Sequence, residues 1–245
     1  MELENKTALI TGAGATGGIG AATARLFARE GATVVISGRD ADRGARVVAE
    51  IDAAGHTARF VLADLTDLVA VRRLADDAGD VDILVNNAAA FAVGPTVDQD
   101  SASFDESFDA NVRGPYFLTA ALAPRMFAKG AGSIVNVSTM AARIGLPGMS
   151  VYGATKSALE SLTRTWAAEF APAGVRVNAV APGPTRSDKV VGLMGDAAEQ
   201  LGRTTPLARM ASTSEIAQVI LFLASDRSSY VTGATLRADG GRTAI

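Results

Sequence analysis

The chain has 245 residues, 48% of them hydrophobic and 20% charged, and a formal net charge of −3. This composition is typical of a folded protein with a buried core and excludes an intrinsically disordered chain. The small negative charge gives no reason to expect a nucleic acid or an anionic membrane as partner. Cysteine is absent, which excludes disulfides and thiolate metal sites, and we expect no metal centre.

The start of the chain, Met1-Glu-Leu-Glu-Asn-Lys6, runs directly into a predicted strand and has no apolar signal region. No segment approaches the ~18 consecutive apolar residues of a membrane span. A chain without cysteine is also compatible with a reducing compartment. We therefore expect a soluble cytoplasmic protein that does not bind membranes.

Short apolar runs alternate with segments of helical periodicity. Six runs indicate strands buried on both faces: Thr7–Thr11, Thr33–Ser37, Arg59–Ala63, Ile83–Asn86, Ser133–Ser138 and Arg176–Ala181. Five segments indicate helices: Gly18–Glu30, Arg43–Ala54, Val69–Ala78, Ser103–Lys129 and Val151–Ala171. This alternation predicts a Rossmann-type α/β fold, a doubly wound parallel sheet with helices on both faces, in a single domain of residues 1–245. The stretch Pro182–Pro206 is too long for an ordinary connection, so we expect a substrate lid at about residues 183–206.

The first predicted strand leads into Thr11-Gly-Ala-Gly-Ala-Thr-Gly-Gly-Ile-Gly20, which an alanine-rich helix follows. Glycines at a strand-to-helix turn let the backbone approach a pyrophosphate, which then lies at the helix N-terminus. A glycine-rich string also suits an ordinary tight turn, but the strand–turn–helix context is the one that a dinucleotide site needs. The predicted cofactor contacts here are Gly12, Gly14, Thr16, Gly18, Ile19 and Gly20.

The end of the second predicted strand indicates how a dinucleotide site would treat the adenosine ribose. The sequence there is Ser37-Gly-Arg-Asp40, with Gly38 in the position of the acidic residue that would bind a free 2′-hydroxyl. A guanidinium pairs well with a phosphate and has no comparable use for a neutral hydroxyl. Arg39 therefore favours NADP over NAD. In the alternative, Arg39 is a solvated loop residue and Asp40 binds the hydroxyl of NAD.

The next two predicted strands also end in polar groups. Asp64 and Leu65 follow the third strand, where the carboxylate is a candidate partner of the adenine amino group. This segment equally suits a helix N-cap at Thr66 or Asp67, and an N-cap is compatible with an adenine contact at Asp64. The fourth strand ends in Asn86-Asn87-Ala88-Ala89, where we expect Asn87 and Ala88 at the cofactor. Paired amides suit backbone bracing around a ligand, although they also suit any turn.

Tyr152 and Lys156 are four residues apart in a predicted helix, so their side chains lie on one face, one turn apart. A tyrosine with its ordinary pKa near ~10 is a poor acid or base at neutral pH. A cation within a few ångströms favours the phenolate, so we expect Lys156 to lower the pKa of Tyr152. This spacing is common on solvated helix faces, and only the cofactor motifs upstream make it a candidate acid–base pair.

With these motifs in this order, the chain resembles the short-chain dehydrogenases/reductases of the classical type over nearly its whole length. The matching motifs are the glycine-rich turn, Asn86-Asn87-Ala88, Asn111, Ser138-Thr139, Tyr152 with Lys156, Pro182-Gly183, Val231-Thr232-Gly233 and Asp239-Gly240-Gly241. The resemblance implies a Rossmann-type fold and reversible hydride transfer between a nicotinamide and a carbonyl or alcohol.

The resemblance also implies a role for each matching residue. Tyr152 would be the acid/base that protonates the nascent alkoxide, and Lys156 would lower its pKa and bind the nicotinamide ribose. Asn111 would brace a water that links the lysine to solvent. The nicotinamide carboxamide would bind at Pro182, Gly183 and Thr185.

One catalytic position departs from the family pattern. The family's stabilising serine lies thirteen residues before the tyrosine; that position is Thr139 here, and Ser138 is one residue earlier. A threonine hydroxyl has the same donor and acceptor capacity, but its extra methyl group narrows the pocket. Neighbouring residues at a strand end tend to point to opposite faces, so Ser138 and Thr139 cannot readily both serve. Because Thr139 has the family's spacing, we favour Thr139 over Ser138. The glycine-rich turn is also two residues longer than the pattern when counted from Gly12, and it fits when counted from Gly14.

We therefore expect an NADP(H)-dependent oxidoreductase that interconverts a ketone and a secondary alcohol. Its pocket is mainly apolar, which suits a lipophilic or alicyclic small molecule, with Arg143 as the one nearby charge. A 3-oxoacyl-(acyl-carrier-protein) reductase is the alternative enzyme, although it would present basic residues where this chain has Gly130 and Ala173. An NADP-binding sensor or scaffold protein is the alternative without chemistry. By resemblance, the helices at Ser103–Lys129 and Val151–Ala171 pair across a two-fold in a homotetramer.

Overall fold

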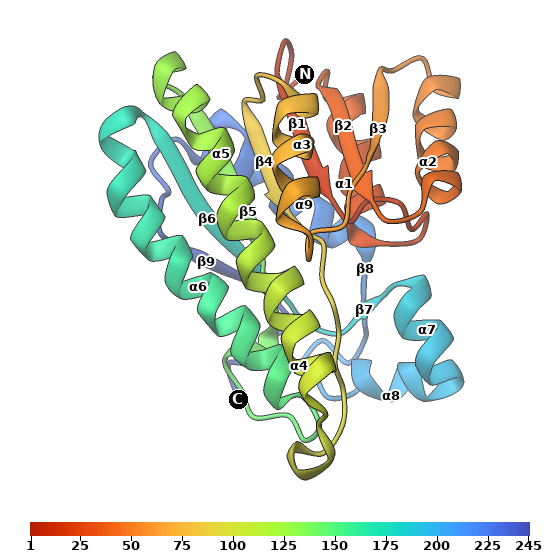
Figure 1. Cartoon of the computed structure of the whole chain (residues 1–245). Coiled ribbons are helices and arrows are strands. Elements are labelled where there is room, and N and C mark those ends of the chain that lie inside the picture. Colours follow the sequence, from red (N-terminus) through yellow and green to blue (C-terminus); the bar gives the residue numbers. More distant parts are fainter.

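A computed structural model of the chain describes residues 1–245, apart from the side chain of residue 196. Seven parallel strands form one sheet in the order β3-β2-β1-β4-β5-β6-β9 (Figure 1). The strands are β1 (Thr7–Thr11), β2 (Thr33–Gly38), β3 (Ala58–Leu62), β4 (Ile83–Asn86), β5 (Gly132–Val137), β6 (Val175–Pro182) and β9 (Thr235–Ala238). Two short strands, β7 (Thr185–Arg186) and β8 (Ala211–Ser212), pair separately.

Helices cover both faces of the sheet, and each face has its own apolar core. On one face lie α1 (Ile19–Arg29), α2 (Ala41–Ala53) and α9 (Thr213–Ala224), and on the other α3 (Leu68–Ala78), α5 (Gly114–Lys129) and α6 (Ser150–Phe170). The remaining helices, α4 (Ser101–Phe108), α7 (Asp188–Met194) and α8 (Ala198–Gly202), lie towards the carboxyl ends of the strands (Figure 1). The predicted Rossmann-type, doubly wound sheet in a single domain is confirmed. None of the described helices is long and apolar enough to cross a membrane.

Three details differ from the sequence-based expectations. β3 is an edge strand with partly exposed side chains, whereas the sequence predicts a strand buried on both faces. An apolar run does not show whether a strand has one neighbour in the sheet or two. β9 was not predicted, since its four residues, Thr-Leu-Arg-Ala, carry little periodicity. The predicted helix at Ser103–Lys129 is divided by a π-helical turn at Asp109–Arg113. The predicted lid segment holds β7, α7 and α8.

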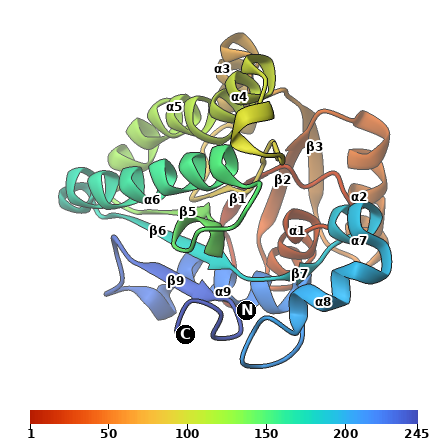
Figure 2. The ribbon, with the colours of Figure 1, turned by 90° about the horizontal axis from the view of Figure 1, so that it is seen from below.

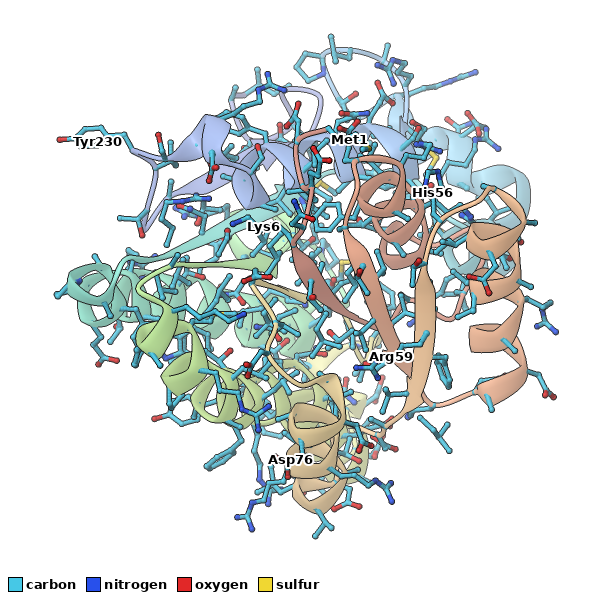
Figure 3. All side chains as sticks on the ribbon, turned by 90° about the horizontal axis from the view of Figure 1, so that it is seen from above. Met1, Lys6, His56, Arg59, Asp76 and Tyr230 are labelled. Carbon is cyan, nitrogen blue, oxygen red and sulfur yellow. The ribbon has the colours of Figure 1, made fainter. Side chains whose placement is uncertain are left out.

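The order of the strands places the functional motifs together. The chain leaves β1 towards β2 and leaves β4 towards β5, so the connections diverge and a crevice opens at the carboxyl ends of β1 and β4. Figure 2 looks onto this end, with α4 and α6 on one side and α7 and α8 on the other. Figure 3 views the opposite end, where His56 lies in the turn between α2 and β3, remote from the crevice.

Gly174 and Gly130 offer a matched test of the packing that starts β6 beside β5. Both glycines have a left-handed backbone, but a Cβ on Gly174 would overlap the carbonyl oxygen of Gly130, whereas a Cβ on Gly130 would meet open space. We expect Gly130→Ala to lower the free energy of unfolding by about 1 kcal/mol, which is the cost of the backbone conformation alone. Gly174→Ala is expected to cost about 3 kcal/mol, because the strand must also move. Chemical denaturation measures both values, and equal losses would contradict the proposed overlap.

Candidate active site

A cleft of about 530 Å³ lies at the carboxyl ends of the strands and extends from the glycine-rich turn to α7 and α8. Most of the predicted site residues line it: Gly12, Gly14, Gly18, Ile19, Arg39, Leu65, Asn87, Ala88, Thr139, Tyr152, Lys156, Pro182, Gly183 and Thr185. Thr16, Gly20, Asp64 and Asn111 are not among the lining residues. The structure therefore brings residues from seven parts of the sequence to one cleft.

The four residues outside the lining have other contacts. Gly20 packs closely, since a Cβ there would lie 2.5 Å from Nδ2 of Asn87. The carbonyl oxygen of Thr16 accepts a hydrogen bond from Arg25. Oδ1 of Asp64 accepts hydrogen bonds from the backbone N–H and the hydroxyl of Thr66, both at 2.9 Å, and Asp67 rather than Thr66 caps α3.

Asn87 braces the glycine-rich turn from the neighbouring strand. Its Nδ2 donates to the carbonyl oxygens of Thr11 at 2.8 Å and Gly12 at 3.1 Å. In return, the hydroxyl of Thr11 accepts the backbone N–H groups of Asn87 and Ala88. Gly12 has a φ of +66°, and a Cβ there would collide with the backbone of Ala88. Thr11 is thus a structural residue of the cofactor turn, which its position in the motif did not reveal.

Tyr152 lies in the first turn of α6, and the side chain of Thr139 hydrogen-bonds its phenol. Burial raises the pKa of Tyr152 to about 12, and the Thr139 hydrogen bond offsets only part of that effect. The phenol is therefore fully protonated at neutral pH, as a proton donor must be. Burial outweighs the lowering of the pKa that the Tyr–Lys spacing led us to expect.

Lys156 is 1% exposed and donates to the backbone carbonyl of Val137 at 2.8 Å. Its Nζ lies 5.9 Å from the centroid of the Tyr152 ring. Burial lowers the pKa of Lys156 to about 8, so the ammonium form still predominates at pH 7. A positive charge therefore stands close to the phenol in a site with little water.

Ser138 points away from the phenol. Its hydroxyl donates to Oε1 of Glu160 at 2.8 Å, and Glu160, which is 3% exposed, also pairs with Arg143 at 2.7 Å. Arg143 is consequently held by Glu160 and does not line the cleft, contrary to its expected place beside the pocket. Glu160 was not identified from the sequence, although it lies two turns after Tyr152 on the same helix.

Asn111 is fully buried in the π-helical turn between α4 and α5. Its Oδ1 accepts the N–H of Ala90 at 2.8 Å, while its Nδ2 donates to the carbonyl of Ala90 and the hydroxyl of Thr155. Two donors and one acceptor of this side chain are therefore committed to protein partners. Asn111 joins the loop after β4 to α6, two residues of which are Tyr152 and Lys156.

The segment at residues 183–206, where we expect a lid, contacts both ends of the cleft. The carboxylate of Asp188, the first residue of α7, accepts the N–H of Gly17 at 3.0 Å. Nζ of Lys189 lies 5.3 Å from the ring of Phe91, which itself meets Tyr152 edge-on with centroids 4.7 Å apart. The surrounding wall is apolar and includes Leu146, Met149, Val190, Leu193 and Leu201. Lys189, and not Arg143, is thus the cation that the segments around the apolar wall contribute, in addition to Lys156 on α6.

Comparison with known proteins gives consistent results. Residues 12–243 match a family model described as enoyl-(acyl carrier protein) reductase. The cis-4-hydroxycyclohexanecarboxylate dehydrogenase of Sinomonas cyclohexanicum is 41% identical over 246 residues, covering 98% of this chain and 97% of its own. A solved structure described as a short chain dehydrogenase/reductase family protein is 59% identical with a TM-score of 0.94 and full coverage of both chains. A gluconate 5-dehydrogenase from Burkholderia cenocepacia, crystallised with NADP and tartrate, is 32% identical with a TM-score of 0.93, covering 100% of this chain and 97% of its own.

Substitution of Thr139 and Ser138 separates a catalytic hydroxyl from a structural one. Because only Thr139 contacts the phenol, we expect Thr139→Val to lower kcat by about 10²- to 10³-fold, the usual effect of losing an oxyanion donor. Thr139→Ser should keep most of the activity, since it retains the hydroxyl. Ser138→Ala should keep kcat but lower the free energy of unfolding by about 1 to 3 kcal/mol, because buried Glu160 loses a partner. The reverse pattern, with Ser138→Ala inactive and Thr139→Val active, would assign the donor to Ser138.

The pH dependence of ketone reduction follows from the two shifted pKa values. Tyr152, with a pKa of about 12, holds its proton across the range, whereas Lys156 is charged below its pKa of about 8 and neutral above it. We expect kcat for reduction to be level up to about pH 8 and to fall above it, because the phenolate then forms without a neighbouring cation. Steady-state kinetics at saturating cofactor between pH 6 and pH 10 measure this profile. A profile that stays level to pH 10 would show that the charge of Lys156 is not required.

Proposed function

The chain belongs to the short-chain dehydrogenase/reductase family, and we propose that it uses NADP(H) to interconvert a ketone and a secondary alcohol. Membership makes it an NAD(P)-dependent oxidoreductase that acts on CH–OH groups or ketones. The observation that supports the proposed chemistry is the buried phenol of Tyr152, hydrogen-bonded to Thr139 and close to Lys156, on the wall of the cleft that contains the glycine-rich turn.

In this proposal Tyr152, Thr139 and Lys156 act on the carbonyl oxygen. A bound nicotinamide supplies or accepts the hydride. Tyr152 gives its proton to the oxygen as negative charge develops there, and the hydroxyl of Thr139 donates a hydrogen bond to the same oxygen. Lys156 stabilises the phenolate that remains. In the opposite direction the phenolate removes the proton of the alcohol. Asn111, whose side chain is committed to Ala90 and Thr155, would brace a relay water through its backbone.

The residues present fit a dinucleotide. The glycine-rich turn opens onto the N-terminus of α1, where backbone N–H groups and the helix dipole favour a pyrophosphate. Thr185, Gly183 and Pro182 line the cleft next to the catalytic wall, where the nicotinamide carboxamide would bind. Arg39 lines the other end and supports NADP as the cofactor. The related gluconate 5-dehydrogenase was crystallised with NADP.

The apolar wall supports a lipophilic or alicyclic ketone as substrate. A relative covering almost the whole chain is named for a hydroxylated cyclohexane carboxylate. A large acidic carrier protein is less well supported, although the matching family model is described as enoyl-(acyl carrier protein) reductase. Gly130 and Ala173 offer no positive charge, and Lys129 is already paired with Asp82 at 3.0 Å. We further expect a cytoplasmic homotetramer, in which exposed Tyr116 and Phe117 of α5 would contact a second copy.

The proposal is tested by NADPH and NADH oxidation with a panel of cyclic ketones, followed by the same assays on Arg39→Ala. We expect the wild-type protein to turn over apolar cyclic ketones and to prefer NADPH. Arg39→Ala should weaken NADPH binding about tenfold and leave NADH binding unchanged, because the lost hydrogen bonds are to a phosphate that only NADPH carries.

Arg46→Ala is a matched control, since Arg46 is exposed on α2 and is not among the lining residues of the cleft. An unchanged cofactor preference in Arg39→Ala would contradict the assignment of NADP. Cofactor binding without turnover of any ketone in the panel would favour the sensor or scaffold alternative.

A further inference from the structure

Arg39 already has an anionic partner in this structure. Its guanidinium lies 3.2 Å from Oε1 of Glu106, which projects from α4, a helix 67 residues further along the chain. Oδ2 of Asp64 lies 4.0 Å from the same guanidinium nitrogen. The cation proposed to bind the 2′-phosphate is therefore held between two carboxylates.

Glu106 is the closer of these two carboxylates to Arg39, and it has fewer other hydrogen bonds than Asp64. Oδ1 of Asp64 is already engaged by Thr66, whereas Glu106 approaches Arg39 from a different element. Figure 2 shows α4 on the other side of the β2 and β3 ends from α7. The pKa of Lys189, on α7, is also affected by these two charges. Burial and then the charge of Arg39 lower it, whereas the charge of Glu106 raises it. The ion pair between Arg39, in the β2–α2 turn, and Glu106, on α4, thus lies at the Arg39 end of the cleft.

The two cofactors would meet this carboxylate differently. A 2′-phosphate that pairs with Arg39 must displace Glu106 or share the guanidinium with it, and like charges at this distance repel. A free 2′-hydroxyl is neutral and needs no such displacement. A nearby carboxylate therefore weakens the binding of NADP(H) and leaves the binding of NAD(H) nearly unaffected.

We propose that Glu106 is a cofactor-specificity residue, whose carboxylate competes with the 2′-phosphate of NADP(H) for the guanidinium of Arg39. It limits the preference for NADP(H) over NAD(H) that Arg39 creates. The inference deepens the proposed function and rests on Arg39 as the phosphate-binding residue. Glu106 belongs to no motif of the sequence and becomes visible only through the ion pair.

Glu106→Gln tests the competition, because it removes the charge and keeps the shape. Dissociation constants of NADPH and NADH are measured by fluorescence titration without substrate, so the readout does not depend on turnover. We expect the dissociation constant of NADPH to fall about two- to fivefold, the size of an exposed ion pair, and that of NADH to stay unchanged. Higher salt should shrink the difference. Asp105→Asn is the matched control, since Asp105 is the exposed neighbour of Glu106 on α4.

The tighter binding of NADPH caused by Glu106→Gln should largely disappear when Arg39→Ala is also present, because no guanidinium is then left for Glu106 to occupy. NADPH binding that is unchanged or weaker in Glu106→Gln overturns the inference; weaker binding would mean that Glu106 orients Arg39 for the phosphate.

The failure of this inference can be distinguished from the failure of the proposed function. Wild-type protein that prefers NADPH, with no effect of Glu106→Gln, removes only the role of Glu106. If the wild-type protein binds both cofactors equally and Glu106→Gln binds NADPH more tightly, the assignment of NADP is wrong and the competition by Glu106 is supported.

Discussion

The hydrogen bonds between Asn87 and the glycine-rich turn are the interaction on which the rest of the site depends. The diverging connections of β1 and β4 open the crevice, but an open crevice has no defined shape until its two sides are joined. The amide of Asn87 satisfies two carbonyls of the turn, and Thr11 satisfies two N–H groups in return. These four hydrogen bonds hold the backbone groups of the turn at a fixed place relative to β4. The loop after β4 then continues to Ala90, where Asn111 joins it to α6.

Burial, more than the Tyr–Lys spacing, decides the protonation states at the catalytic wall. Removing water penalises the charged form of both groups, so the phenol keeps its proton and the ammonium holds its own less tightly. In the proposed reduction the two shifts would complement each other. The phenol would lose its proton only when an oxygen with developing negative charge is present to take it. The lysine, still charged at neutral pH, would stabilise the phenolate at that moment.

The sequence predicted six of the seven strands of the sheet, the single domain and most of the residues that line the cleft, because these depend largely on local patterns. Apolar runs such as Thr33–Ser37 show the buried strands, and the order of the strands then brings their carboxyl ends together. Contacts between distant side chains could not be predicted. Ser138 meets Glu160 22 residues away, Arg39 meets Glu106 67 residues away, and Gly17 meets Asp188 171 residues away. No periodicity encodes such pairs, so the sequence does not identify Glu160, Glu106 or Asp188, and it places Arg143 beside the pocket although Glu160 holds it.

The contact between Gly17 and Asp188 connects the cofactor end of the cleft to the lid. A Cβ on Gly17 would overlap the carboxylate of Asp188 as it is placed here. A residue with a side chain at position 17 would therefore displace that carboxylate and weaken its hydrogen bond with the N–H of residue 17. The next residue of α7, Lys189, lies over Phe91, and Phe91 packs against Tyr152. A displacement of the glycine-rich turn would thus reach Tyr152 through α7 as well as through Asn87, so contacts link the glycine-rich turn, α7 and the wall that carries Tyr152.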